Sequence, residues 1–210
     1  MATEVSLFSG NAVAEPSQAV DALRKLAMAA QQGSGGKAFM KLDKGSGKFI
    51  WGADSVEVDE SELWAVNPAS FMIGKIGWKD GQVVGEHMFP ITSGQTIDES
   101  ELTPIESAKD GDGWRDQLTF ELKHIADEVE VVFKTTSYGG KNAIAALAGE
   151  IGEHTAQNPA LPIAVVKLKS DWYKHKKYGR IYNPTFEVVD WLGPDGTKPK
   201  PSKPKPKPLV

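Results

Sequence analysis

The sequence predicts a mainly β protein: a small five-stranded barrel with one helix placed before its last two strands. Three observations lead to this prediction. Apolar residues alternate with polar ones over short runs, turn residues separate these runs, and within the barrel region a helical pattern appears only once, late in the chain. We expect the barrel to span residues 37–192, between an N-terminal segment, 1–36, and a flexible Lys-Pro tail, 193–210.

The first part of the chain is expected to contain a docked helix and two hairpins. Residues 16–32 have apolar side chains at helical spacing, and the Gly-Ser-Gly-Gly run at 33–36 would end that helix. Residues 37–52 are predicted to form two short strands around a Gly-Ser-Gly turn. Residues 63–91 contain a second hairpin, which turns at the Lys-Asp-Gly sequence 79–81.

The second part of the chain supplies the remaining strands and the helix. The acidic stretch 54–62 is expected to be a solvated loop, and the polar stretch 93–117 a long loop. Residues 141–154 have the apolar spacing of a helix. Further strands are expected at 118–125, 129–138, 162–173 and 180–192. Several strands, one helix and a final hairpin follow in the order of an OB-fold, a Greek-key barrel with its helix between strands 3 and 4.

Composition and charge limit the classes of function. The chain is 40% apolar and 25% charged, as globular proteins are, and no apolar run approaches the ~20 residues of a membrane helix. It has no cysteine, and its start lacks the pattern of a secretory signal, so an intracellular protein without membrane contact is expected. Residues 165–210 hold eleven Lys or Arg and four Asp or Glu (+7), whereas residues 1–164 hold thirteen and twenty-four (−11). This asymmetry favours a polyanionic partner, the alternative being a basic tail that folds back on the acidic body.

Sequence motifs for catalysis or metal binding are incomplete. The run SYGGKNAI departs from a phosphate loop, because Thr135 stands where its first Gly should be and Asn142 follows Lys141. The run KDGDGW matches a calcium loop only at Asp110 and Asp112. The four histidines are scattered and no Gly-x-Ser-x-Gly elbow is present. We therefore expect a protein that is not an enzyme and needs no cofactor and no metal.

The last hairpin is the most informative stretch, since residues 170–191 contain two Trp, three Tyr, four Lys or Arg and a His. In a strand, Trp172 would share one face with Ser170, whereas Tyr173 would lie on the other. The basic tip between the strands would project side chains that no core requires. Aromatic rings stack on unpaired bases while Lys and Arg neutralise phosphates. The alternative interpretation is that Trp172, Tyr182, Phe186 and Trp191 are ordinary core or strand-face residues.

A second basic and aromatic stretch lies at 41–51. In an OB-fold, the loop between strands 1 and 2 and the loop between strands 4 and 5 flank the binding groove. The two stretches fall in these loops, so both are predicted to bind DNA. The candidate residues are Lys41, Lys48, Phe49, Trp51, Lys169, Trp172, Tyr173, Lys174, Lys176, Lys177, Tyr178, Arg180 and Tyr182 in the hairpins, and Lys198, Lys200, Lys203, Lys205 and Lys207 in the tail.

The runs LWAVNPASFMIGKIGW and KYGRIYNPTFEVVDW resemble proteins of tailed bacteriophages, among them OB-fold single-stranded-DNA-binding proteins. The resemblance covers about residues 37–192. It implies sequence-independent binding of single-stranded DNA in phage DNA replication or recombination, in the cytoplasm of the infected bacterial host. Many such proteins end in an acidic tail that recruits replication partners, whereas this chain ends in KPKPSKPKPKPLV. We expect this basic tail to reach DNA phosphates instead, including those of duplex DNA.

Two other classes of function stay open at this point. One is a non-enzymatic phage interaction or structural module that uses the aromatic hairpin as a protein contact surface. The other is a nuclease that uses scattered Asp, Glu and His residues with magnesium. Binding that weakens steeply with salt would separate DNA binding from the first, and metal-dependent cleavage of an oligonucleotide would identify the second.

Overall fold

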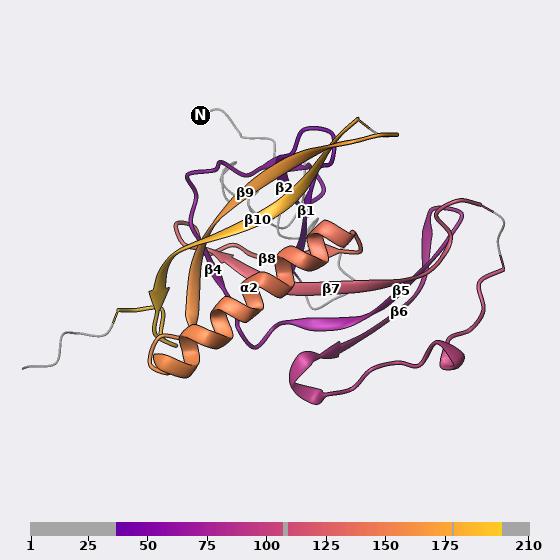
Figure 1. Ribbon diagram of the computed structural model, residues 1–210. Helices are drawn as coiled ribbons and strands as arrows, with labels where there is room; N and C mark the ends of the chain where they lie inside the picture. The colour runs from indigo at the N-terminus through magenta and orange to yellow at the C-terminus, as the bar shows by residue number, and fades with distance from the viewer. Residues whose placement is uncertain (1–36, 107–108, 178, 199–210) are drawn as a thin grey trace, which may run out of the picture.

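The computed structural model describes residues 37–106, 109–177 and 179–198 (Figure 1). Ten strands and one long helix lie in these ranges, together with two short 3₁₀ turns. The predicted N-terminal helix, Tyr178 and the tail lysines from Lys200 onward lie outside the described residues. The strands are β1 Ala38–Leu42, β2 Phe49–Trp51, β3 Val56–Glu57, β4 Trp64–Val66, β5 Met72–Lys79, β6 Gln82–Pro90, β7 Gly113–His124, β8 Glu130–Thr135, β9 Ile163–His175 and β10 Gly179–Leu192; the helix is α2 Tyr138–Gln157, and the 3₁₀ turns are η1 Ile91–Ser93 and η2 Glu99–Glu101.

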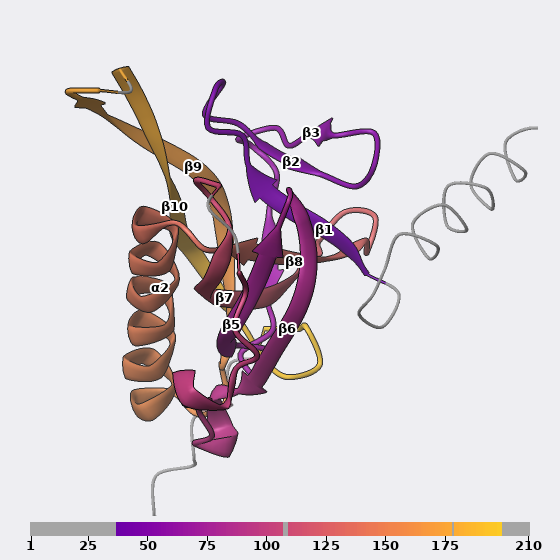
Figure 2. The ribbon, with the colours of Figure 1, turned by 90° about the vertical axis from the view of Figure 1, so that its right-hand side faces the viewer.

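The described strands form a single, strongly curled sheet. Its strand order is β10-β9-β4-β7-β8-β1-β2-β3, with β5 paired to β7 and β6 paired to β5 off this path. The helix α2 lies along one side of the curl, as the view in Figure 2 shows. The prediction of a mainly β fold, with one helix placed before a final hairpin, is confirmed.

The local hairpins also agree with prediction. The strands β1 and β2 pair around a turn at 43–48, and β5 and β6 pair around Asp80 and Gly81. Both of these residues have positive φ (54° and 75°), the backbone that a two-residue hairpin turn with right-handed strand twist needs.

Three features of the sheet differ from the prediction. Ten described strands replace the expected five. The expected loop 54–62 contains the short strand β3, and its Val58 is buried. The expected loop 93–117 ends early, because β7 begins at Gly113. Strand pairing explains this last difference: β5 holds residues 113–119 in register although they lack a strand-like alternation.

A cluster of aromatic rings fills the inside of the curl. The rings of Phe49, Phe120, Phe133 and Phe186 have centroids 5.1–5.9 Å apart, in tilted and edge-to-face contacts. The helix α2 covers this cluster with three buried side chains, those of Ile144, Leu147 and Ile151.

The helix α2 begins three residues before the predicted start. Ser137 caps its N-terminus, and the Ser137 Oγ accepts a hydrogen bond from the Gly140 N–H at 3.1 Å. Gly140 is needed there, because a Cβ at this position would lie 2.2 Å from Thr135 Oγ1. At the other end the ring of His154 stacks on Trp191 of β10, with centroids 3.6 Å apart.

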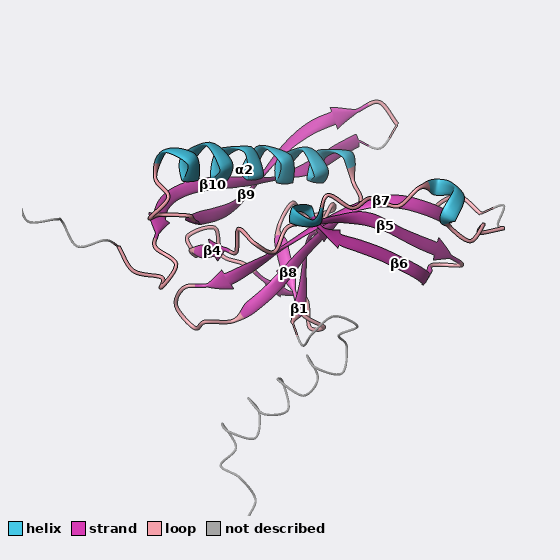
Figure 3. Cartoon of the chain, turned by 90° about the horizontal axis from the view of Figure 1, so that it is seen from below, coloured by secondary structure: helices cyan, strands magenta, loops and turns pink. Residues whose placement is uncertain are grey.

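The β9–β10 hairpin is the longest pair of strands and extends beyond the rest of the sheet (Figure 1). Its lower half, which includes Ala164, Val166 and Leu168, is buried in the core, whereas residues 171–174 are exposed. In Figure 3 the strands β5, β6 and β7 lie side by side and form a second projecting part of the sheet, separate from the β9–β10 hairpin. Within the described residues no helix combines the length and apolarity required to cross a membrane.

Candidate nucleic-acid interface

Two segments that are 123 residues apart in the sequence meet at the base of the projecting hairpin. The Ser170 Oγ of β9 donates a hydrogen bond to the carbonyl oxygen of Gly47, in the β1–β2 turn, at 2.6 Å. The ring of Tyr182 lies directly against the same glycine, because a Cβ on Gly47 would be 2.3 Å from Tyr182 Cδ1. The two basic and aromatic stretches identified in the sequence are therefore joined in space.

The β1–β2 turn is shaped by Asp43. Its carboxylate accepts hydrogen bonds from the N–H groups of Gly45 and Ser46 at 3.2 and 3.1 Å, and from the Ser46 hydroxyl at 2.7 Å. These bonds, that from the Ser46 hydroxyl above all, lower the pKa of Asp43. The turn presents Lys44 to solvent next to the hairpin, and Lys41 is exposed on β1.

Two aromatic rings are exposed on the outer part of the hairpin. Trp172 is 55% and Tyr173 47% exposed, and they are neighbours in the strand, so they lie on opposite faces as predicted. The Arg180 guanidinium lies over the Trp172 ring, 4.2 Å from its centroid. Arg180 Nη1 also donates to the Tyr182 hydroxyl at 3.2 Å. One face of the Trp172 ring is thus occupied by a cation that also fixes the ring in place.

Basic side chains surround these rings. Lys174, Lys176, Lys177 and Arg180 are all exposed at the tip of the hairpin. Within the described part of the chain, neither Lys174 nor Lys176 forms an ion pair with a carboxylate. The turn itself is supported by the Lys177 N–H, which donates to His175 Nδ1 at 3.1 Å.

Other residues predicted to bind DNA have different surroundings. Phe49 is only 3% exposed and its ring belongs to the core, and Trp51 is partly buried against that core. Three lysines are paired with carboxylates: Lys48 with Glu57 at 2.5 Å, Lys169 with Glu187 at 2.7 Å and Lys198 with Asp190 at 2.7 Å. Lys198 follows the end of β10 that lies away from the hairpin tip. Of the described residues predicted to bind DNA, those that combine exposure with freedom from a carboxylate partner therefore lie mostly on the outer hairpin.

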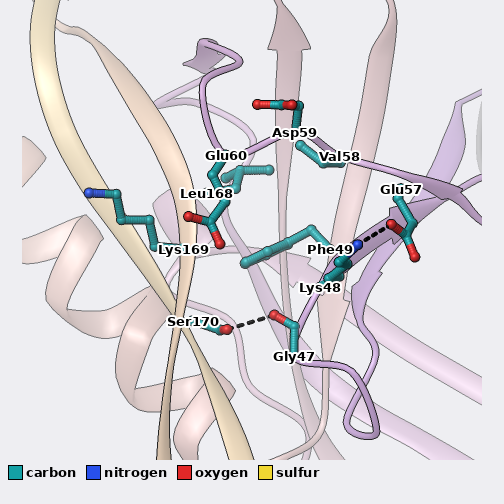
Figure 4. Close-up of a pocket in the computed structure, with 10 residues that line it drawn as sticks. All are labelled: Gly47, Lys48, Phe49, Glu57, Val58, Asp59, Glu60, Leu168, Lys169 and Ser170. Atoms are coloured by element: carbon teal, nitrogen blue, oxygen red, sulfur yellow. Dashed lines mark hydrogen bonds and ion pairs between the residues drawn. The ribbon is translucent and has the colours of Figure 1, made fainter.

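A pocket of about 410 Å³ opens between the β2–β3 region and β9 (Figure 4). Its lining residues are Gly47, Lys48, Phe49, Glu57, Val58, Asp59, Glu60, Leu168, Lys169 and Ser170. The three acidic residues were missed by sequence reasoning, which interpreted 54–62 as a solvated loop. The apolar Val58 within that acidic stretch was the available signal that part of it turns inward, since Val58 is buried whereas Val56 is exposed.

The two lysines that line the pocket are both stabilised in their charged form by neighbouring carboxylates. The pKa of Lys48 is raised, mainly by its hydrogen bond to Glu57, and the pKa of Lys169 is raised, mainly by its hydrogen bond to Glu187. Glu60 raises both pKa values further through its charge. Within the described residues, no group of three or more His, Asp or Glu side chains has the arrangement of a metal site.

Comparisons of the chain with protein-family models, with curated proteins and with solved structures found no match. The geometry of the hairpin, the β1–β2 turn and the pocket is therefore the basis for a functional assignment.

Proposed function

We propose that this protein binds single-stranded DNA without sequence specificity, through the outer β9–β10 hairpin and the adjoining β1–β2 turn. The contact of Ser170 and Tyr182 with Gly47 is the observation that supports it most, because it brings two separate basic and aromatic segments to one end of the molecule. Exposed rings supply stacking for unpaired bases, and the lysines supply salt-dependent attraction to phosphates. No cofactor is needed for this activity.

The same proposal extends to the fold and the biological setting. The order of strands, helix and final hairpin supports an OB-like barrel whose first and last hairpin loops flank the binding surface. We propose further that the protein acts on single strands exposed during phage DNA replication or recombination. Both statements follow from the resemblance and from this arrangement of loops.

Fluorescence titration tests the proposal directly. Wild-type protein is titrated with oligothymidine of about 16 nucleotides, a length that one OB-fold covers, and with a duplex of equal length. We expect tryptophan quenching by the single strand and weaker binding of the duplex. Trp172→Ala should weaken single-strand binding by about 1–3 kcal/mol, the usual contribution of one stacked base. Absence of single-strand binding at low salt would refute the proposal.

A protein contact surface is the second candidate function. Trp, Tyr and Arg are the residue types that dominate binding energy at protein interfaces, and Trp172, Tyr173 and Arg180 are all exposed on the outer hairpin. Such a surface would bind its partner with little dependence on salt. A steep decrease of DNA affinity with salt therefore favours the first function over the second.

A further inference from the structure

The pocket beside the hairpin has an apolar floor. Phe49, Val58 and Leu168 line it and are all buried, at 3%, 8% and 2% exposure. The Ser170 hydroxyl on its wall is engaged with Gly47. Ser170 and Trp172 are two residues apart on β9, so the pocket and the exposed ring share one face of the strand about 7 Å apart. A strand stacked on Trp172 would pass the mouth of the pocket.

Most polar side chains at the mouth of the pocket already have a hydrogen-bond or ion-pair partner within the protein. Lys48 is turned to Glu57, with which it forms an ion pair (Figure 4). Lys169 forms an ion pair with Glu187. The Asp59 carboxylate accepts from the N–H and the hydroxyl of Ser61, at 2.7 and 2.6 Å. Four charged residues of the pocket lining, Lys48, Glu57, Asp59 and Lys169, therefore already have partners.

Glu60 is the exception. Figure 4 shows its carboxylate pointing into the space between β9 and Phe49. Within the described residues no donor and no cation lies within hydrogen-bond or ion-pair distance of it, although its charge acts on Lys48 and Lys169. The pocket thus combines three apolar residues, Phe49, Val58 and Leu168, with one acceptor directed inward.

A ligand that fits must be planar and apolar on its faces, with an N–H donor at its edge. Bases with an exocyclic amino group meet this description, and a carboxylate accepts from such a group, as from the N4 amine of cytosine. Thymine has no amino group, and its one edge donor, N3–H, lies between two carbonyl oxygens that would repel the carboxylate. We propose that the pocket receives one unstacked base bearing an exocyclic amino group, which donates to Glu60. This inference rests on the proposed single-stranded-DNA binding and adds a base preference to it.

The test compares homopolymers on the full chain. Dissociation constants are measured for oligodeoxycytidine and oligothymidine of equal length, with wild type, Glu60→Gln and Glu150→Gln. Glu150 is an exposed residue of α2, so its variant controls for the loss of one negative charge, which raises affinity for any strand. We expect wild type and Glu150→Gln to bind the cytidine strand about tenfold more tightly. In Glu60→Gln the ratio should fall toward one, because an amide can also donate to thymine.

The outcomes separate the two proposals. Equal wild-type affinities for the two strands would overturn the base pocket while leaving single-strand binding intact. A cytidine preference that is unchanged in Glu60→Gln would overturn the role of Glu60. No binding of either strand would refute the proposed function, and the pocket assignment with it. Perturbation of the Gly47 and Leu168 amide resonances by deoxycytidine monophosphate, and not by thymidine monophosphate, would give independent support.

Discussion

Gly47 determines whether the two halves of the candidate interface can meet. Its φ of 74° is a left-handed backbone, and the Tyr182 ring occupies the space where a side chain would begin. Gly52 has almost the same φ, 71°, but a Cβ added to it would have no other atom within 4 Å. The pair therefore separates the cost of backbone strain from the cost of steric contact.

We predict that Gly52→Ala lowers the free energy of unfolding by about 1–2 kcal/mol, the usual cost of a left-handed conformation. Gly47→Ala should lower it by about 2–4 kcal/mol, because the Tyr182 ring must also move. It should in addition weaken single-strand binding, whereas Gly52→Ala should not. Urea unfolding and the oligothymidine titration measure both effects. Equal losses of stability in the two variants would show that the ring gives way at no cost.

Individual side chains at the site were only partly predictable from the sequence. Strand alternation predicted Trp172 and Tyr173 on opposite faces, but it left open whether Trp172 belongs to the core. Both are exposed, because this part of β9 extends beyond the rest of the sheet. The pairing of Lys169 with Glu187 was not predictable, because it depends on the register between two strands. Phe49 was assigned to the DNA surface since it lies among lysines, yet alternation in β2 turns it into the core.

At the scale of elements, the outer β9–β10 hairpin is the unit that should set the salt dependence of binding. Four cationic side chains at its tip predict a slope of log K against log salt of about −3 for a single strand. We predict that Lys176→Gln reduces the size of this slope by about 0.7. The matched control is Lys79→Gln, an exposed lysine at the end of β5 in the other long hairpin. Titrations at several salt concentrations measure the slopes, and an equal change in both variants would argue against a localised interface.

Elements with local pairing were predictable, and those with distant partners were not. The β1–β2, β5–β6 and β9–β10 hairpins follow from turn residues and neighbouring apolar runs. The parallel pairing of β1 with β8 and the pairing of β4 with β9 join segments about a hundred residues apart. No local pattern encodes such contacts, although they join the two ends of the described chain in one sheet.

At the scale of the whole molecule, ion pairs tie separate elements together. Asp116 of β7 forms ion pairs with Lys75 of β5 at 3.0 Å and with Lys141 of α2 at 3.3 Å. Its hydrogen bond to Lys75, more than any other cause, lowers the pKa of Asp116 from the usual 3.8. The pKa of Lys75 is in turn raised above 10.5, chiefly by its hydrogen bond to Glu99.

These shifts give a direction to the pH dependence of stability. Because the folded-state pKa of Asp116 is lowered, its contribution is complete above 3.8 and is lost as the pH falls through the folded-state value. The contribution of Lys75 has the opposite sense: it is complete below 10.5 and is lost as the pH rises through the raised value. The ion pairs therefore contribute a plateau of stability between about pH 4 and pH 10, with a decline on either side.

We predict that Asp116→Asn lowers stability on the plateau and makes the decline below about pH 4 shallower, since the asparagine has no proton to take up. The control is Asp54→Asn, because Asp54 is exposed and makes no ion pair or side-chain hydrogen bond within the described residues. Urea unfolding at a series of pH values gives both curves. If the free energy of unfolding of Asp116→Asn declined below pH 4 as steeply as that of wild type, the ion pairs of Asp116 with Lys75 and Lys141 would contribute nothing to folding. The packing of α2 beside the hairpin would then depend on its apolar face and on the stacking of His154 on Trp191.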